Sequence, residues 1–94
     1  PAVMRWNKTE NSERQQLVSS ILRNVEGAAS YDASNLLDNL ITNLGMPRNL
    51  SAVGITHKHF QKIAEQAMFT PWVPHNPRPI MGPPEIIQIL QLAA

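Results

Sequence analysis

The sequence predicts a small all-α protein, a bundle of about four short helices with a proline-rich connector before the last one. Apolar residues recur at helical spacing in four separate segments, and no segment shows the alternation typical of a strand. Six of the eight prolines fall between Pro71 and Pro84, where they exclude regular helix. We therefore expect four helices of roughly 8–13 residues each.

The first predicted helix begins at Ser12 and ends before Gly27. Pro1–Asn7 precedes it as an apolar strip that is too short to fold alone and whose apolar side chains are expected to lie against another surface. Ser12 and Gln15 have the spacing of a capping box, in which a hydroxyl and an amide satisfy free N–H groups at a helix start. Apolar residues follow at helical spacing at Leu17, Val18, Ile21, Leu22 and Val25.

The second predicted helix has clear signals at both ends. Ser30 or Asp32 can cap its start, and Gly45 supplies a left-handed stop. Its broad apolar stripe consists of Ala33, Leu36, Leu37, Leu40, Ile41 and Leu44. Residues 46–54 then form a connector, in which we expect Leu50 and Val53 to be anchors and Gly54 to be a bend.

The third and fourth predicted helices flank the prolines. Thr56 caps the third, whose apolar positions are Phe60, Ile63, Ala64, Ala67 and Met68. The proline-rich segment favours an extended, stiff crossing over the surface. Pro83-Pro84-Glu85 suits the first turn of a helix, and the apolar residues of this last helix are Ile86, Ile87, Ile89, Leu90 and Leu92.

Composition indicates one domain with a modest core. For 94 residues, 43% hydrophobic content with 16% charge is apolar, so we expect a partner, another copy or a missing domain to cover part of the surface. A net charge of +1 gives no electrostatic reason for binding nucleic acid, and no apolar run is long enough to span a membrane. The absence of cysteine and of a leader before Pro1 favours a cytoplasmic protein. Pro1 itself either follows a removed initiator Met or is the cut end of a longer polypeptide.

Residue chemistry alone indicates no active site. His57 and His59 are two positions apart on a predicted helix and point about 200° away from each other, so they do not share a metal ion there. The carboxylates are dispersed, and the glycines are too isolated for a phosphate loop. Trp72, near two prolines, is either a packing anchor or the wall of a pocket, and we favour the anchor. Arg78 is expected to bond to carbonyls at a helix end or to a carboxylate.

Three stretches resemble the C-terminal end of iron-containing alcohol dehydrogenases, a superfamily that includes maleylacetate reductases. They are P-A-V-M-R-W-N at 1–7, L-G-M-P-R-N-L at 44–50 with V-G-I at 53–55, and N-P-R-P-I at 76–80, with the helix Phe60–Met68 between the last two. The resemblance covers nearly the whole chain. It implies a single helical module at 1–94, the distal part of the helical domain of these enzymes.

The resemblance also implies what this module lacks. The family holds a divalent metal such as iron with one Asp and three His, and it binds NAD(P) in a separate domain. None of those ligands has a counterpart at His57, His59 or His75, so we expect no catalytic residue, metal or cofactor site in this chain. Residues just before N-P-R can line the family's substrate pocket, and here these would be Trp72 and Val73.

Three functions follow as hypotheses. The first is a fragment or truncated relative of such an oxidoreductase, inactive alone, whose partner is the missing nucleotide-binding domain. The second is a stand-alone, self-associating interaction module, and hence a homo-oligomer. The third is a helix-turn-helix DNA binder, because Gly54-Ile55-Thr56 precedes a helix carrying Lys58 and Lys62, although two lysines are few for neutralising phosphates. We favour the first and expect no nucleic-acid or membrane partner.

Overall fold

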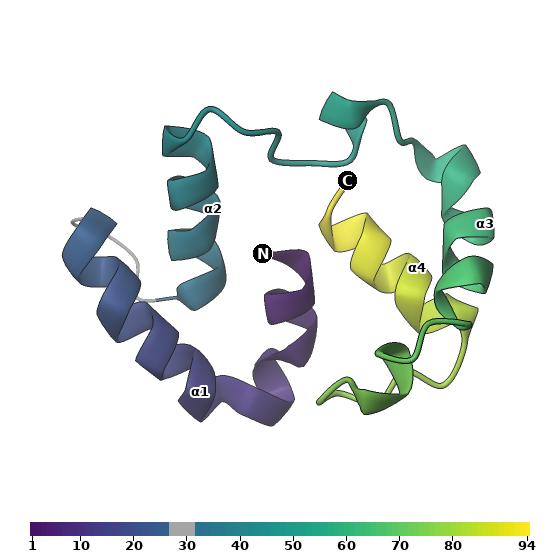
Figure 1. Cartoon of the computed structure of the whole chain (residues 1–94), viewed down its shortest axis with the longest axis horizontal. Helices are drawn as coiled ribbons and strands as arrows, with labels where there is room; N and C mark the ends of the chain where they lie inside the picture. The colour runs from purple at the N-terminus through teal and green to yellow at the C-terminus, as the bar shows by residue number, and fades with distance from the viewer. Residues whose placement is uncertain (27–31) are drawn as a thin grey trace.

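The structure, a computed structural model, describes residues 1–26 and 32–94 and is all-α over these ranges, as predicted (Figure 1). Two short 3₁₀ turns lie in the connectors, η1 at Ser51–Val53 and η2 at Val73–His75. The four α-helices are α1 (Ala2–Glu26), α2 (Ala33–Asn43), α3 (His57–Ala67) and α4 (Pro83–Leu92). Helix α1 packs against α2 and α4, and α3 packs against α4.

Helix α1 differs most from the prediction. It spans 25 residues, and the apolar strip Pro1–Asn7 is not a separate segment, because all but Pro1 of it forms the first half of this helix. Asn11 has non-helical dihedral angles (φ −134°, ψ 31°) and divides α1 into two halves at a kink. The second half begins directly after this kink, at the predicted start Ser12, but the predicted capping role of Gln15 was wrong.

Gln15 joins the two halves of α1 instead of capping the second. Its Nε2 donates to the Met4 carbonyl and to Asn11 Oδ1, both at 2.8 Å. Since a buried amide must find partners, Gln15 faces the first half of the helix. The side chain of Leu17, two positions on, therefore points away from the interior.

With this orientation, the second half of α1 buries polar side chains and exposes apolar ones, the reverse of a usual amphipathic helix. Gln15 and Ser19 are each only 8% exposed, whereas Leu17 and Ile21 are 68% and 67% exposed. Val18, the other member of the exposed group, lies between them in sequence. Three members of the apolar stripe that the sequence indicated are therefore exposed, whereas Leu22 is half-buried.

Helix α2 agrees with the prediction at both ends. The Asp32 side chain accepts from the Ser34 backbone N–H at 3.0 Å and so caps the helix. The alternative cap, Ser30, lies outside the described residues. Gly45 has φ +69°, which fits its predicted role as the left-handed stop. Leu36, at the centre of the stripe, is fully buried.

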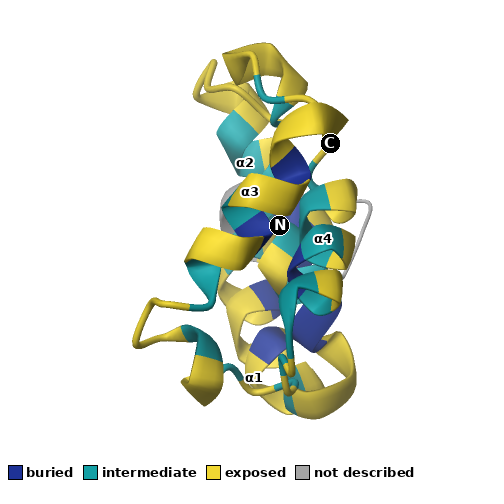
Figure 2. Ribbon diagram, turned by 90° about the vertical axis from the view of Figure 1, so that its right-hand side faces the viewer, coloured by how far each residue is buried: buried dark blue, intermediate teal, exposed yellow. Residues whose placement is uncertain are grey.

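Helices α3 and α4 also begin where the sequence predicted. The Thr56 N–H donates to His59 Nδ1 at 3.0 Å, so His59 is part of the helix start. The Gly82 N–H donates to Glu85 Oε2 at 3.1 Å in the same manner before α4. Phe60 and Ala64 of α3 and Ile86 of α4 are buried and complete the small core (Figure 2), whose other apolar members are Trp6, Ala33 and Leu36.

The two connectors correct two further expectations. Val53 is exposed and is not an anchor, whereas Leu50 is half-buried and its N–H donates to the Ala93 carbonyl at 2.8 Å, joining the connector to the C-terminal end. The proline-rich segment is not extended throughout, because Val73–His75 form the turn η2. Gly54, with φ +79°, is the predicted bend.

Candidate functional site

The proline-rich segment is fastened to the first half of α1 by four residues, Trp6, Asn7, Asn76 and Arg78, which we call the clamp. Asn7 Nδ2 donates to Asn76 Oδ1 at 3.0 Å, and Asn76 Nδ2 donates back to Asn7 Oδ1 at 2.7 Å. The Arg78 N–H also donates to Asn7 Oδ1, at 3.3 Å. Because Asn7 is buried, these bonds form away from competing water.

Arg78 covers Trp6 within the clamp. Its guanidinium carbon lies 3.7 Å from the centroid of the Trp6 ring, and its Nη1 donates to the Trp6 carbonyl at 3.2 Å. The sequence led us to expect carbonyls at a helix end or a carboxylate as the partner of Arg78, whereas its partner is the Trp6 carbonyl within the first half of α1. Trp6 is 4% exposed, and its indole Nε1 has no hydrogen-bond partner among the described residues.

The two residues predicted to line a pocket, Trp72 and Val73, lie at the start of η2. Trp72 is 78% exposed, so the packing-anchor interpretation is wrong for the ring as the structure places it. Val73 is half-buried. The His75 N–H donates to the Trp72 carbonyl at 3.0 Å and the Asn76 N–H to the Val73 carbonyl at 3.2 Å, so one turn links this pair to the clamp.

The exposed apolar surface is concentrated on the same segment. Phe69, Met81 and Trp72, at 89%, 83% and 78% exposed, exceed every other large apolar side chain that is described. All three lie between the end of α3 and the start of α4. Large exposed apolar side chains gathered in this way mark a surface that contacts another molecule or domain.

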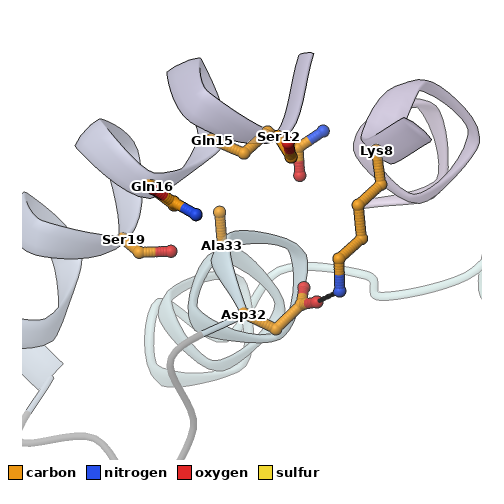
Figure 3. Close-up of a pocket in the computed structure, with 7 residues that line it drawn as sticks. All are labelled: Lys8, Ser12, Gln15, Gln16, Ser19, Asp32 and Ala33. Atoms are coloured by element: carbon orange, nitrogen blue, oxygen red, sulfur yellow. Dashed lines mark hydrogen bonds and ion pairs between the residues drawn. The ribbon is translucent and has the colours of Figure 1, made fainter. Parts of the chain in front are cut away.

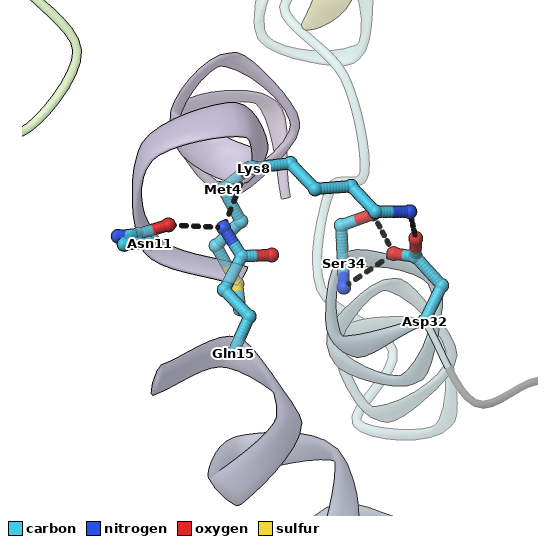
Figure 4. A network of polar contacts seen from close by, with 6 residues as sticks. All are labelled: Met4, Lys8, Asn11, Gln15, Asp32 and Ser34. Carbon is cyan, nitrogen blue, oxygen red and sulfur yellow. Dashed lines mark hydrogen bonds and ion pairs between the residues drawn. The ribbon is translucent and has the colours of Figure 1, made fainter. Parts of the chain in front are cut away.

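A separate cavity of about 350 Å³ lies between the second half of α1 and the start of α2 (Figure 3). Lys8 and Asp32 form an ion pair at its edge, and Ser34 hydrogen-bonds to the same carboxylate (Figure 4). The Lys8 bond, with those from Ser34, lowers the pKa of Asp32 from its usual 3.8 to about 2. The sequence analysis did not single out this pair, because the two residues are 24 positions apart.

Most residues that line the cavity are polar, but most of the surface that they expose to it is apolar. The lining residues include no nucleophile next to a base and no pair of carboxylates. The cavity therefore shows no catalytic constellation among the residues that line it.

Comparison with protein families gives a match over residues 1–94 to the Fe-containing alcohol dehydrogenase family, C-terminal. The chain belongs to this family. No curated protein and no solved structure matches it significantly. Family membership confirms the resemblance that the motifs suggested, and two of those motifs, at 1–7 and 76–80, are the segments that form the clamp.

The histidines have local roles in this family member. His59 accepts the Thr56 N–H, and the His57 ring lies 4.8 Å from that of Phe60, while His75 ends η2. Among the described residues, no group of three or more histidine, cysteine, aspartate or glutamate side chains could hold a metal ion. These residues therefore do not fit the family's metal. Helices long and apolar enough to cross a membrane are likewise not found over 1–26 and 32–94.

Proposed function

We propose that this chain is the distal part of the helical domain of a metal- and NAD(P)-dependent oxidoreductase, of the alcohol dehydrogenase or maleylacetate reductase type, and is inactive alone. Its contribution is a shaped surface that completes the enzyme. The metal and nucleotide sites come from other parts of such an enzyme, and we derive no chemical step through them. The lack of cysteine is compatible with a reducing cytoplasm, where we propose that it acts.

The observation that carries this proposal is the exposure of Trp72 on a fastened segment. An aromatic ring that is 78% exposed gains nothing from the hydrophobic effect in this chain, yet the clamp holds its segment in one conformation. We therefore propose that Trp72 and Val73 form one wall of a substrate pocket when the rest of the enzyme covers them. Such a wall excludes water and orients a substrate, which is binding and not proton or hydride transfer.

A complementation assay tests this function. The chain is mixed with a family enzyme from which the corresponding C-terminal residues have been deleted, and NAD(P)H oxidation is followed with Fe²⁺ or Zn²⁺ present. We expect no turnover from either part alone and turnover from the mixture. Trp72→Ala should raise KM in the mixture, whereas Leu44→Ala, which alters an exposed apolar residue outside the segment, should not.

The exposed face of α1 supports a second candidate, a self-associating module. Leu17, Val18 and Ile21 are exposed on one helix while the polar Gln15 and Ser19 are buried. Light scattering of wild type and Ile21→Glu distinguishes the two functions. A wild-type oligomer that Ile21→Glu converts to a monomer would favour self-association, and a monomeric wild type would remove it.

The DNA-binding hypothesis gains no support from the geometry. A recognition helix needs a preceding helix packed on it through a short turn. Before α3 the chain carries only the three-residue η1, after a connector that leaves α2 at Asn43. Failure to retard duplex DNA at low salt would remove this hypothesis.

A further inference from the structure

We infer that Asn7 is a positioning residue, which acts through Asn76 to fix the direction of Trp72. This inference rests on the proposed function of Trp72 and Val73 as a pocket wall. Asn7 lies 65 positions before Trp72 in the sequence and touches the proline-rich segment only at Asn76 and Arg78 among the bonds described. Its role is therefore exerted at a distance from the wall.

The route from Asn7 to Trp72 is short and stiff. Two hydrogen bonds between the side-chain amides of Asn7 and Asn76 hold the end of η2. The backbone N–H groups of His75 and Asn76 donate to the carbonyls of Trp72 and Val73 and close the turn. A single 3₁₀ turn is too short to be stable alone, so its geometry depends on an anchor at its end. Pro74 within the turn fixes one further φ angle, which leaves little freedom between the anchor and Trp72.

Asn7 is chemically suited to this role because its side chain both donates to and accepts from the proline-rich segment, in which Asn76 Nδ2 also donates to the Arg78 carbonyl at 2.6 Å. Pro77 and Pro79 have no N–H, so the Arg78 N–H is the one backbone donor of residues 77–79, and Asn7 Oδ1 accepts it. The same oxygen accepts from Asn76 Nδ2, and Asn7 Nδ2 donates to Asn76 Oδ1. A leucine of similar size would fill the space and make none of these three bonds.

Relaxation measurements on the ¹⁵N-labelled full chain test the inference directly. For the residues of 72–76 that carry an N–H, which excludes Pro74, we expect backbone order parameters near the roughly 0.85 of rigid backbone in wild type and below about 0.6 in Asn7→Leu, with α2 and α4 unchanged. Asn7→Asp keeps the two bonds that Oδ1 accepts but places a second acceptor opposite Asn76 Oδ1, so we expect order between that of Asn7→Leu and that of wild type. Asn39→Leu, an exposed asparagine on α2, is the matched control.

Order at 72–76 that is the same in Asn7→Leu and wild type would overturn the inference. If Asn7→Leu does not fold, Asn76→Ala removes both bonds to Asn7 without altering a helix, together with the bond from Asn76 Nδ2 to the Arg78 carbonyl, and the same loss of order is expected for residues 72–76. An unchanged order in that variant would equally overturn the inference.

The complementation assay separates this inference from the proposed function. Asn7→Leu and Trp72→Ala should each raise KM several-fold, and the double variant should raise it no further than Trp72→Ala alone, because both changes remove the same wall. Disorder at 72–76 without a change in KM would uphold the positioning and contradict the pocket wall. Additive effects on KM would contradict the link between Asn7 and Trp72.

Discussion

Arg78 makes three contacts in the clamp, two of them through its side chain. Its backbone N–H reaches Asn7, its Nη1 reaches the Trp6 carbonyl, and its guanidinium plane covers the Trp6 ring. A planar guanidinium can stack and donate at once, whereas the ammonium of lysine is a compact point charge. The clamp therefore depends on arginine specifically and not on positive charge alone.

We expect Arg78→Lys to lower the free energy of unfolding by about 1 kcal/mol, because the stack on Trp6 is lost. We expect Arg78→Ala to lower it by about 2 kcal/mol, because both the stack and the hydrogen bond to the Trp6 carbonyl are lost. Urea unfolding followed by circular dichroism measures both changes. Arg14→Ala is the matched control, because Arg14 is exposed and has no described partner. An effect of Arg78→Ala no larger than that of the control would show that the clamp does not stabilise the fold.

Asp32 should make stability depend on pH in the acid range. Its pKa in the folded chain is about 2, below its usual 3.8, so its contribution is present above about pH 4 and is lost as the pH falls from 4 towards 2. Lys8→Met removes the largest cause of this shift and should raise the pKa of Asp32. Carboxyl NMR titration of Asp32 checks this, with Lys58→Met as the control, and an unchanged pKa in Lys8→Met would contradict the ion pair.

The clamp shows why a sequence predicts the positions of helices more successfully than the contacts between distant residues. Arg78 was expected to bond to carbonyls at a helix end or to a carboxylate, but nothing near it in the sequence identifies the carbonyl of Trp6, 72 positions away. Asn7 and Asn76 are 69 positions apart, and an asparagine pair leaves no periodic signal. The expectation that Trp72 is a packing anchor was wrong for the same reason, because the burial of a side chain depends on which distant segments pack against it.

The kink of α1 places more constraint on the fold than any other single feature of a helix. Gln15 bridges the kink by donating to Met4 and Asn11, and this sets the rotation of the second half, with Leu17 and Ile21 outward. The burial of the polar Gln15 and Ser19 on this helix follows from that rotation. The rotation of a helix can be fixed by a hydrogen bond even when its apolar stripe favours another direction.

Gln15→Leu should lower the free energy of unfolding by roughly 1–3 kcal/mol, because the Asn11 amide oxygen beside it loses a donor in a part-buried place. Gln16→Leu makes the same change at the exposed neighbouring position and should have little effect. Thermal unfolding of the two variants gives the comparison. Equal melting temperatures would mean that Gln15 does not hold the two halves together.

The end of α2 offers a backbone test. Gly45→Ala places a side chain at φ +69° and should cost about 1 kcal/mol, although the space around it is open. Gly82→Ala is the control, because Gly82 is extended and an added Cβ would meet Pro84 Cδ at an ordinary 3.5 Å. Denaturant midpoints measure both, and a Gly45→Ala cost equal to that of the control would contradict the left-handed stop.

The starts of α2, α3 and α4 were predictable because their signals are local. Asp32 accepts the N–H of Ser34, two residues on. The N–H of Thr56 and the N–H of Gly82 each donate to a side chain three residues on, which for Gly82 is Glu85. The first half of α1 was not, because Ala2–Asn7 carries no cap and its helical state depends on burial of Trp6 and on the clamp. Local chemistry predicts where helices begin, and tertiary contacts decide whether a short apolar strip joins one.

Over the residues that the structure describes, the molecule consists of two helix pairs joined through α1, which contacts both α2 and α4 (Figure 1). The core between them is small, and the apolar side chains that remain exposed lie mainly on the segment between α3 and α4 and on the second half of α1. Membership of the Fe-containing alcohol dehydrogenase family gives these surfaces a context. We propose that the first of them, with Trp72, faces the substrate pocket of a complete enzyme.

Turnover on mixing is the most direct test of this proposal. The wild-type chain is titrated into a family enzyme that lacks the corresponding C-terminal residues, and NAD(P)H oxidation is recorded with metal present. We predict no turnover by the chain alone and a saturable gain on mixing, which Trp72→Ala weakens through KM. Metal-dependent turnover by the chain alone, or no gain on mixing with a chain shown by circular dichroism to be folded, would contradict the proposal.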